Sequence, residues 1–200
     1  MPPSIRIEDL VAVTNGRLVA PTAVHDFAGA SVDSRRILPG SLFVALAGER
    51  QDGHSYVPAA FRAGAVGALV AHPIPLPSES GGFLVQVADP LFALQDLAAW
   101  WRSRFPVRVV GVTGSTGKTL AKETVADVLS RGFRVLRNEG NLNSESGLPM
   151  TLLNLEAADE VVVVAGRLCM VGMVTGVRMA ATYLRSNMGT ICWYSYTCAP

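Results

Sequence analysis

The sequence is short of charge, of cysteine and of long apolar runs, and each shortage excludes a class of protein. Charged residues make up 16% of the 200 residues, and the formal net charge is +1 at pH 7. A chain this close to neutral creates no broad field that would attract nucleic acid or an anionic membrane. We therefore expect neither as a partner, and any anion must be recognised locally.

Cysteine occurs three times, at Cys169, Cys192 and Cys198, all in the last fifth of the chain. The spacing lacks the paired arrangement that a zinc site or a redox motif needs. We interpret the three residues as ordinary thiols.

The long apolar stretch at residues 161–184 does not predict a membrane span, because Arg167 and Arg178 interrupt it. The first ten residues contain two acids, Glu8 and Asp9, and no apolar core like that of a secretion signal. We expect a soluble protein of the cytoplasm.

Acidic residues are absent after Glu160, which is the largest change of composition along the chain. Arginines, methionines, cysteines and aromatics are mixed in the following segment without helical or strand periodicity. We interpret residues 165–200 as an atypical tail that derives from a shifted reading frame or an erroneous end.

Half of the residues are hydrophobic, which is enough for one large core or two small ones. Residues 1–106 alternate short strands with helices, the last of which starts at the cap Asp89 and ends before Pro106. Residues 107–164 have the pattern of strand, glycine-rich turn, helix and strand, a β-α-β unit that implies a parallel sheet. We predict an α/β protein in which a small mixed α/β domain, residues 1–106, precedes the truncated start of a parallel-sheet domain, residues 107–164.

Turn signals place the elements of the first predicted domain. Pro39 and Gly40 form a turn between two short apolar runs. Apolar residues at helical spacing follow, and the helix ends near Gly64. The predicted elements are strands at 30–32, 42–46 and 83–87 and a helix at about 57–64.

The stretch GVTGSTGKTLAKE, residues 111–123, follows an apolar strand and opens a helix. Small residues in such a turn let backbone N–H groups converge on phosphate oxygens, and the helix adds the positive end of its dipole. Lys118, the predicted catalytic residue, would place its ammonium against the β and γ phosphates, and the Thr119 hydroxyl would be one ligand of Mg²⁺. The residues predicted to contact the phosphates of ATP are Thr113, Gly114, Ser115, Thr116, Gly117, Lys118 and Thr119. We call residues 113–119 the phosphate loop.

Two features of this region depart from the common pattern. The strict motif has glycine where this chain has Val112, so the match is to a variant loop, and a tight strand-to-helix turn that contains Gly-Lys-Thr by chance is the alternative. A magnesium nucleotide site also needs an acid at the end of a neighbouring strand. The candidate strand at residues 161–164 ends in Ala165 and Gly166 instead.

Four stretches are informative together: SVDSRRILPGSLFVALAGERQDGHSYV, ALQDLAAWW, VVGVTGSTGKTLAKE and NEGNLNSESGLPMTLLNL. They resemble the Mur ligases of peptidoglycan synthesis, and the resemblance extends from about residue 28 to about residue 155. The Lys-Glu pair after the phosphate loop and the Gly-Asn-Leu-Asn segment resemble the branch of the family that adds D-alanyl-D-alanine. The resemblance implies an N-terminal domain that binds a UDP-muramoyl group, a central ATPase and a C-terminal domain that brings the incoming amino acid or dipeptide.

The resemblance also implies a reaction. ATP would activate the carboxylate of UDP-N-acetylmuramoyl-tripeptide as an acyl phosphate, and the amine of D-alanyl-D-alanine would attack it. ATP and Mg²⁺ are the implied cofactors, and the two peptides are the implied partners. We favour a monomer.

Site residues follow from the resemblance position by position. Ser31, Asp33, Ser34 and Arg35 match the uridine-nucleotide segment of the family, in which Arg35 would pair with the diphosphate. A capped turn with solvated arginines is the alternative for this segment, and His54 is interpreted as a turn residue. In the second predicted domain, the substrate-binding residues are Asn141 and Asn143.

The sequence departs from the family at Ala165, where Mur ligases have a magnesium-binding glutamate. The family also uses a carbamoylated lysine farther along, whereas this chain has only Lys118 and Lys122. We therefore expect the 200 residues to lack turnover. Two other functions stay open: a non-catalytic module that binds a UDP-sugar, and an unrelated phosphate-loop NTPase such as a small kinase.

Overall fold

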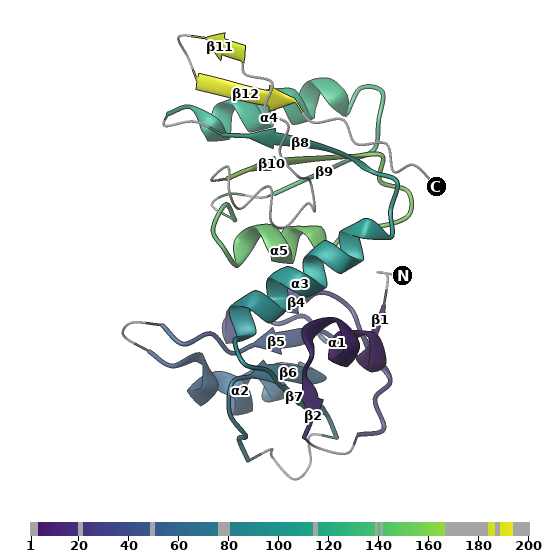
Figure 1. Cartoon of the computed structure of the whole chain (residues 1–200), viewed down its shortest axis with the longest axis vertical. Helices are drawn as coiled ribbons and strands as arrows, with labels where there is room; N and C mark the ends of the chain where they lie inside the picture. Colours follow the sequence, from purple (N-terminus) through teal and green to yellow (C-terminus); the bar gives the residue numbers. More distant parts are fainter. Residues whose placement is uncertain are drawn as a thin grey trace. The chain divides into compact units, whose positions relative to one another are not determined.

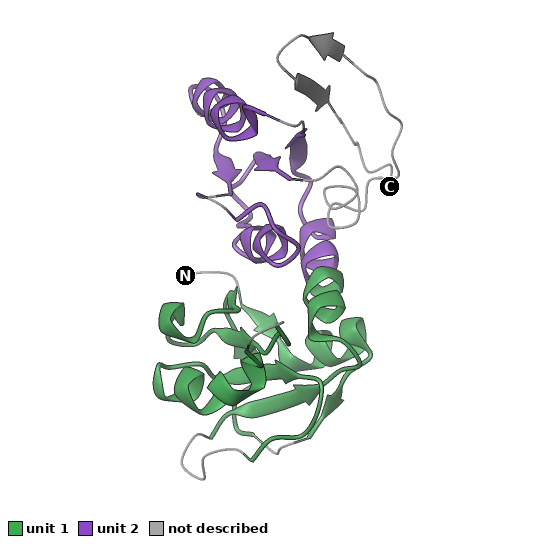
Figure 2. Cartoon of the chain, turned by 90° about the vertical axis from the view of Figure 1, so that its left-hand side faces the viewer, with its two compact units in different colours: residues 1–97 green, residues 98–200 purple. Residues whose placement is uncertain are grey.

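The computed structural model describes residues 4–19, 22–48, 51–75, 81–113, 116–138, 140 and 142–166, and the backbone of strands at 184–186 and 189–193. The chain divides into two compact units, residues 1–97 and 98–200 (Figure 2). Each unit is described by itself. The division of the chain between the two units falls within helix α3 (Pro90–Ser103). It lies ahead of the domain boundary after residue 106 that the sequence predicts, and that boundary stays a prediction.

Unit 1 is built on a five-stranded sheet with the order β2-β7-β6-β5-β4 (Figure 1). Strands β4 to β7 run parallel, and β2 pairs antiparallel with β7. A separate antiparallel pair joins β1 and β3. The strands are β1 (Ile5–Arg6), β2 (Arg17–Leu18), β3 (Asp26–Phe27), β4 (Ala30–Ser31), β5 (Leu42–Val44), β6 (Gly67–Val70) and β7 (Phe83–Gln86).

Short helical segments connect these strands. They are α1 (Ile7–Thr14), α2 (Val57–Arg62) and the 3₁₀ turns η1 (Ser34–Arg36) and η2 (Gly53–Tyr56). The predicted strands at 30–32, 42–46 and 83–87 and the predicted helix at 57–64 are confirmed to within a few residues.

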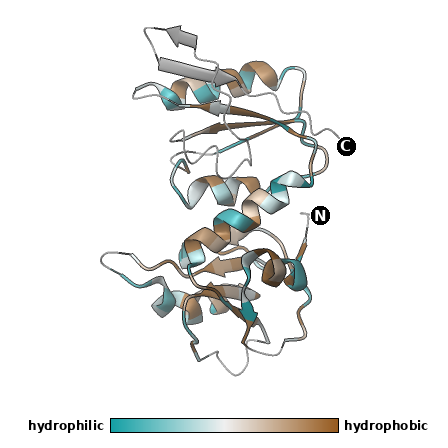
Figure 3. Ribbon diagram, viewed as in Figure 1, coloured by the Kyte–Doolittle hydropathy of each residue, from teal (hydrophilic) through white to brown (hydrophobic). Residues whose placement is uncertain are grey.

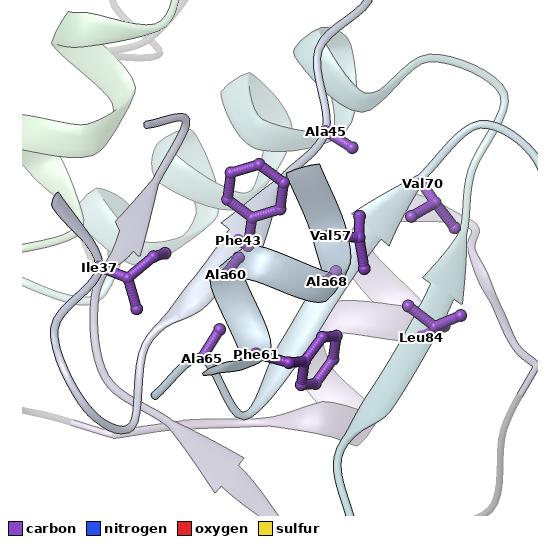
Figure 4. Close-up of a cluster of buried hydrophobic side chains, with 10 residues drawn as sticks. All are labelled: Ile37, Phe43, Ala45, Val57, Ala60, Phe61, Ala65, Ala68, Val70 and Leu84. Atoms are coloured by element: carbon purple, nitrogen blue, oxygen red, sulfur yellow. The ribbon is translucent and has the colours of Figure 1, made fainter. Parts of the chain in front are cut away.

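One hydrophobic cluster of unit 1 lies between α2 and the parallel strands. All four residues of β6 are buried, as expected for a central parallel strand with both faces covered. Figure 4 shows apolar side chains from α2 and from the strands around one shared space. The cluster consists of Ile37, Phe43, Ala45, Val57, Ala60, Phe61, Ala65, Ala68, Val70 and Leu84.

Helix α3 begins at the predicted cap. One carboxylate oxygen of Asp89 accepts hydrogen bonds from the backbone N–H of Leu91 (2.7 Å) and of Phe92 (3.2 Å). This satisfies donors that have no partner within the helix. No helix among the described residues is long and apolar enough to cross a membrane.

Unit 2 contains a second five-stranded sheet with the order β11-β12-β8-β10-β9. The first β-α-β unit is confirmed as parallel, but β10 lies between its two strands. The backbone of β12 pairs antiparallel with β8, and β11 pairs antiparallel with β12. The strands are β8 (Arg108–Val112), β9 (Val135–Arg137), β10 (Val161–Ala165), β11 (Leu184–Ser186) and β12 (Gly189–Trp193).

Helices α4 (Lys118–Leu129) and α5 (Gly147–Leu152) lie on opposite sides of this sheet (Figure 1). All five residues of β10 are buried. Alternate residues of the strand, such as Val161 and Val163, pack with Ala126 of α4, so Val162 and Val164 point to the other face. Figure 3 shows the hydrophobic character of the central strands.

The register of the parallel strands brings three segments to one edge of the sheet. Val112 of β8 pairs with Ala165 of β10, and Arg137 of β9 pairs with Val163. The carboxyl ends of β8, β10 and β9 are therefore nearly level. In open parallel sheets, ligands bind outside such an edge, and this edge carries both the phosphate loop and the segment after β9.

His54 joins two segments of unit 1. Its side chain is 5% exposed, Nδ1 lies 2.5 Å from an Asp52 carboxylate oxygen, and Nε2 accepts the backbone N–H of Ala71 at 2.8 Å. Because Nε2 accepts, the ring proton must be on Nδ1, where it is donated to Asp52. The interpretation of His54 as a turn residue fits these contacts.

The same contacts argue against a metal site beside His54. Ligand atoms of Asp52, His54 and His72 lie within 4.8 Å of one another. A metal would need a lone pair from His54, yet one ring nitrogen carries the proton and the other accepts an amide. Asp52 and His72 alone are too few ligands, so we assign the cluster a structural role.

We expect His54→Ala to destabilise unit 1 by about 1–3 kcal/mol, because it leaves the Ala71 N–H without its acceptor. His72→Ala is the matched control, since that side chain is 60% exposed, stacks on His54 and lies 4.0 Å from an Asp52 oxygen, but accepts no backbone N–H among the described residues. Urea unfolding followed by circular dichroism measures both. Equal losses in the two variants would contradict the assigned role of His54.

Candidate functional site

The phosphate loop connects β8 to α4 through a left-handed residue. Gly117 is the N-cap of α4 and has φ +77°, a conformation that costs other residues roughly 1–2 kcal/mol. A Cβ built on Gly117 would meet no atom within 4 Å. The glycine is therefore needed for its backbone conformation, and the space beside it is open.

The start of α4 is suited to an anion. Among the described residues, no side chain caps the helix. The N–H groups of a first helical turn have no partners within the helix itself. These donors and the positive end of the helix dipole attract negative charge. The arrangement fits the phosphates of a nucleotide.

The structure places most of the predicted phosphate contacts on this turn. Thr113 follows β8 and is half-buried, Thr116 and Gly117 are exposed, and Lys118 is the first residue of α4. Thr119 is exposed beside it. Two further predicted contacts, Gly114 and Ser115, lie outside the described residues.

Among the described residues, those at the end of β10 and the start of α4 do not fit a magnesium ion held mainly by the protein. The backbone N–H of Ala165 donates to the side-chain oxygen of Asn138 (3.0 Å), and that of Gly166 donates to the Val112 carbonyl (3.1 Å). The end of β10 thus offers no carboxylate, and Thr119 contributes one hydroxyl. Mg²⁺ in nucleotide sites usually takes one or two carboxylates besides phosphate oxygens.

The segment after β9 contains a functional candidate that the sequence analysis missed. Asn138 is 1% exposed, and its side-chain N–H donates to the carbonyl of Leu142 at 3.0 Å. Of the predicted asparagines nearby, Asn143 is half-buried, while Asn141 lies outside the described residues. A polar residue directly after a parallel strand is a signal that would have singled out Asn138.

The sequence analysis also did not predict that Lys122 is buried. It is 1% exposed, its ammonium donates to the backbone carbonyl of Asn138, and it lies 2.7 Å from a carboxylate oxygen of Glu123. The other oxygen of Glu123 lies 3.0 Å from the Arg137 guanidinium. The helical spacing from Lys122 to the buried Ala126 would have predicted an inward position.

In unit 1, the four predicted substrate residues lie together in and before η1. The Ser31 hydroxyl donates to the carbonyl of Asp33 (3.0 Å) and accepts its N–H (3.1 Å). Asp33 caps η1 by accepting the N–H of Arg35 (3.0 Å), and Ser34 is half-buried. The turn is thus stabilised from within.

Asp33 and Arg35 also form a two-pronged ion pair. The Arg35 guanidinium donates to both carboxylate oxygens, at 2.9 and 2.8 Å. These hydrogen bonds, together with the Arg35 N–H, lower the pKa of Asp33 from 3.8 to about 2. The Arg35 side chain is nevertheless 87% exposed, so its remaining N–H donors face solvent.

Comparisons with known proteins point to one family. A family model described as "Mur ligase family, catalytic domain" matches residues 26–99, which precede the phosphate loop. The UDP-N-acetylmuramoyl-tripeptide--D-alanyl-D-alanine ligase of Treponema pallidum is 40% identical over 162 residues, which make up 77% of this chain and 35% of that protein. The chain therefore spans about a third of the length of this curated relative.

Two solved structures share the fold. A crystal structure of MurF from Acinetobacter baumannii matches with a TM-score of 0.75 and 30% identity, over 87% of this chain and 40% of that one. The MurF ligase of Thermotoga maritima, solved in complex with ADP, matches with a TM-score of 0.61 and 31% identity, over 74% of this chain and 34% of that one. The agreement of sequence and fold shows that the chain belongs to the Mur ligase family.

Proposed function

We propose that this chain is the nucleotide-binding and UDP-sugar-binding part of an ATP-dependent ligase. The ligase would join D-alanyl-D-alanine to UDP-N-acetylmuramoyl-tripeptide in the synthesis of peptidoglycan precursors. The observation that carries the proposal is the start of α4 behind the left-handed Gly117, where no described side chain caps the helix. The relatives of this chain bear the activity in their names.

The chemistry requires a carboxylate to become a good electrophile. The terminal carboxylate of the tripeptide would take the γ-phosphoryl group from ATP and release ADP. The amine of D-alanyl-D-alanine would then attack the acyl carbon, form the amide bond, and release phosphate and a proton. Positioning and charge neutralisation supply most of the catalysis in phosphoryl transfer.

The residues of unit 2 would serve the first of these steps. Backbone N–H groups at the start of α4 would bind phosphate oxygens, and Lys118 would neutralise charge on the transferred group. Thr119 would contact a magnesium ion that arrives with the nucleotide. Asn143, in the segment that follows β9, would contact an acyl substrate bound beside the nucleotide.

Unit 1 would bind the UDP end of the sugar nucleotide. Arg35 has N–H donors that face solvent, and its guanidinium would pair with the diphosphate, as guanidinium groups commonly do. Because both Asp33 oxygens already accept from Arg35, the diphosphate would have to share the guanidinium with Asp33 or displace it. The carboxylate therefore tunes the affinity of this turn for anions.

A non-catalytic UDP-sugar module is the second candidate. It is favoured by Ala165, which leaves the end of β10 without a metal-binding carboxylate. For the 200 residues as they stand, we expect binding without ligation. Release of ADP that depends on both peptide substrates would contradict this, and phosphorylation of a small alcohol would instead favour an unrelated NTPase.

We expect Lys118→Ala to weaken ADP binding by about 10- to 100-fold, the range for losing a charge-assisted contact to phosphate. Arg131→Ala is the matched control, because it removes an exposed positive charge just beyond the other end of α4. Isothermal titration of the chain with ADP measures both. If the two variants bind ADP alike, the phosphate loop is not the nucleotide site.

We expect Arg35→Ala to weaken UDP binding by about tenfold or more, through loss of the guanidinium contact to the diphosphate. Arg36→Ala removes the neighbouring exposed arginine and should change the affinity little. Titration calorimetry with UDP separates the two. A larger loss in the Arg36 variant would move the site away from Arg35.

The ion pair between Asp33 and Arg35 also predicts how stability and the pKa of Asp33 depend on Arg35. Because the pKa of Asp33 is lowered in the folded chain, its contribution to stability is complete above about pH 4 and is lost as the pH falls toward 2. Arg35→Gln should return this pKa toward 3.8, whereas Arg36→Gln should not. Carboxyl ¹³C chemical shifts followed from pH 7 to pH 2 would show the difference, and an unshifted titration in Arg35→Gln would refute it.

A further inference from the structure

We propose that Lys122 and Asn138 act together as positioning residues that hold the segment after β9 against the phosphate loop. This inference rests on the proposed nucleotide site, and it assigns to that site two residues that would touch neither phosphate nor sugar. Their contacts link three segments at one edge of the sheet: helix α4, residues 138–142 and the end of β10.

The first argument is the burial of a charge. The Lys122 ammonium is removed from water, at a cost that only close partners offset. Among the described residues it has two such partners, Glu123 and the carbonyl of Asn138. An apolar residue of the same length would fill this position without that cost. The lysine is therefore better explained by the carbonyl that it fixes in place than by stability.

The second argument is the complete use of the Asn138 side chain. Its N–H group donates to the carbonyl of Leu142 and closes a short loop, while its oxygen accepts the N–H of Ala165. Together with the bond from Lys122 to its backbone carbonyl, Asn138 has a defined partner in each direction. Neither end of the amide can turn without breaking a bond to the backbone.

The third argument is the place of these contacts in the fold. Strands β8 and β9 are not neighbours, because β10 lies between them, so their carboxyl ends are roughly 10 Å apart. Among the described residues of the two loops that follow them, no backbone–backbone hydrogen bond connects one loop to the other. Lys122 lies one helical turn beyond Lys118, and Asn138 directly follows β9. The bond between Lys122 and Asn138 therefore spans the gap that the sheet leaves.

The consequence is a fixed relation between phosphate and acyl substrate. Lys118 and Lys122 are on one rigid helix, so the position of the phosphate-binding turn is transmitted to the carbonyl of Asn138. The predicted substrate asparagines, Asn141 and Asn143, follow Asn138 closely in the chain. A fixed carbonyl at Asn138 therefore restricts the positions that the following segment can take. Preorganisation of this kind reduces the ordering that binding must otherwise impose.

The test uses the 200-residue chain and the variants Lys122→Met and Asn138→Asp. Methionine removes the ammonium and leaves an apolar chain of similar length, and Glu123 keeps Arg137 as its partner. Aspartate keeps an oxygen for the Ala165 N–H but loses the donor to Leu142. Arg131→Met is the matched control, because Arg131 is exposed and lies just beyond the C-terminal end of α4.

Two readouts separate positioning from folding. Hydrogen exchange of peptides covering residues 138–146, in the absence of nucleotide, should rise by about tenfold in both variants but not in the control. ADP affinity should fall by about three- to tenfold in both variants, while the thermal midpoint of Lys122→Met changes little.

Each outcome decides one part of the proposal. If the wild-type chain does not bind ADP, the proposed nucleotide site is wrong, and the exchange data still decide whether Lys122 and Asn138 hold the segment. Unchanged exchange in both variants overturns the link itself. Raised exchange with unchanged ADP affinity overturns the positioning role, and so does loss of the folded state in Lys122→Met.

Discussion

The register of three parallel strands is the constraint on which unit 2 depends. β10 is hydrogen-bonded on both edges and buried along its whole length, so β8 and β9 are fixed on either side of it. Because the pairing aligns their carboxyl ends, three chain segments that are distant in sequence meet at one edge. The phosphate loop, residues 113–119, gains its neighbours at this edge from the register of the strands.

Much of the fold could be predicted from local patterns. The start of α3 at Asp89, the strand before the phosphate loop and the helix after it all follow from caps, glycines and apolar spacing. The insertion of β10 between β8 and β9 could not be predicted in this way. A β-α-β pattern fixes the relative direction of two strands, but whether a later strand separates them depends on contacts across the sheet.

The candidate site was predictable where the backbone chemistry is local, as at Gly117 and Lys118. It was not predictable at Lys122 and Asn138, because a lysine and an asparagine are usually exposed and their burial depends on partners from other elements. In unit 1 the polar residues Ser31 and Asp33 stabilise their own turn. Sequence alone cannot tell such a turn from a ligand site, since both use the same side chains.

Lysine occurs at only two positions in this chain, and the structure treats them differently. Lys122 is 1% exposed and contacts Glu123 and the backbone carbonyl of Asn138, whereas Lys118 is half-buried at the first position of α4. Because Lys122 is the more buried of the two, an acylating reagent would have better access to Lys118. Modification at Lys118 would then report on the turn at the start of α4.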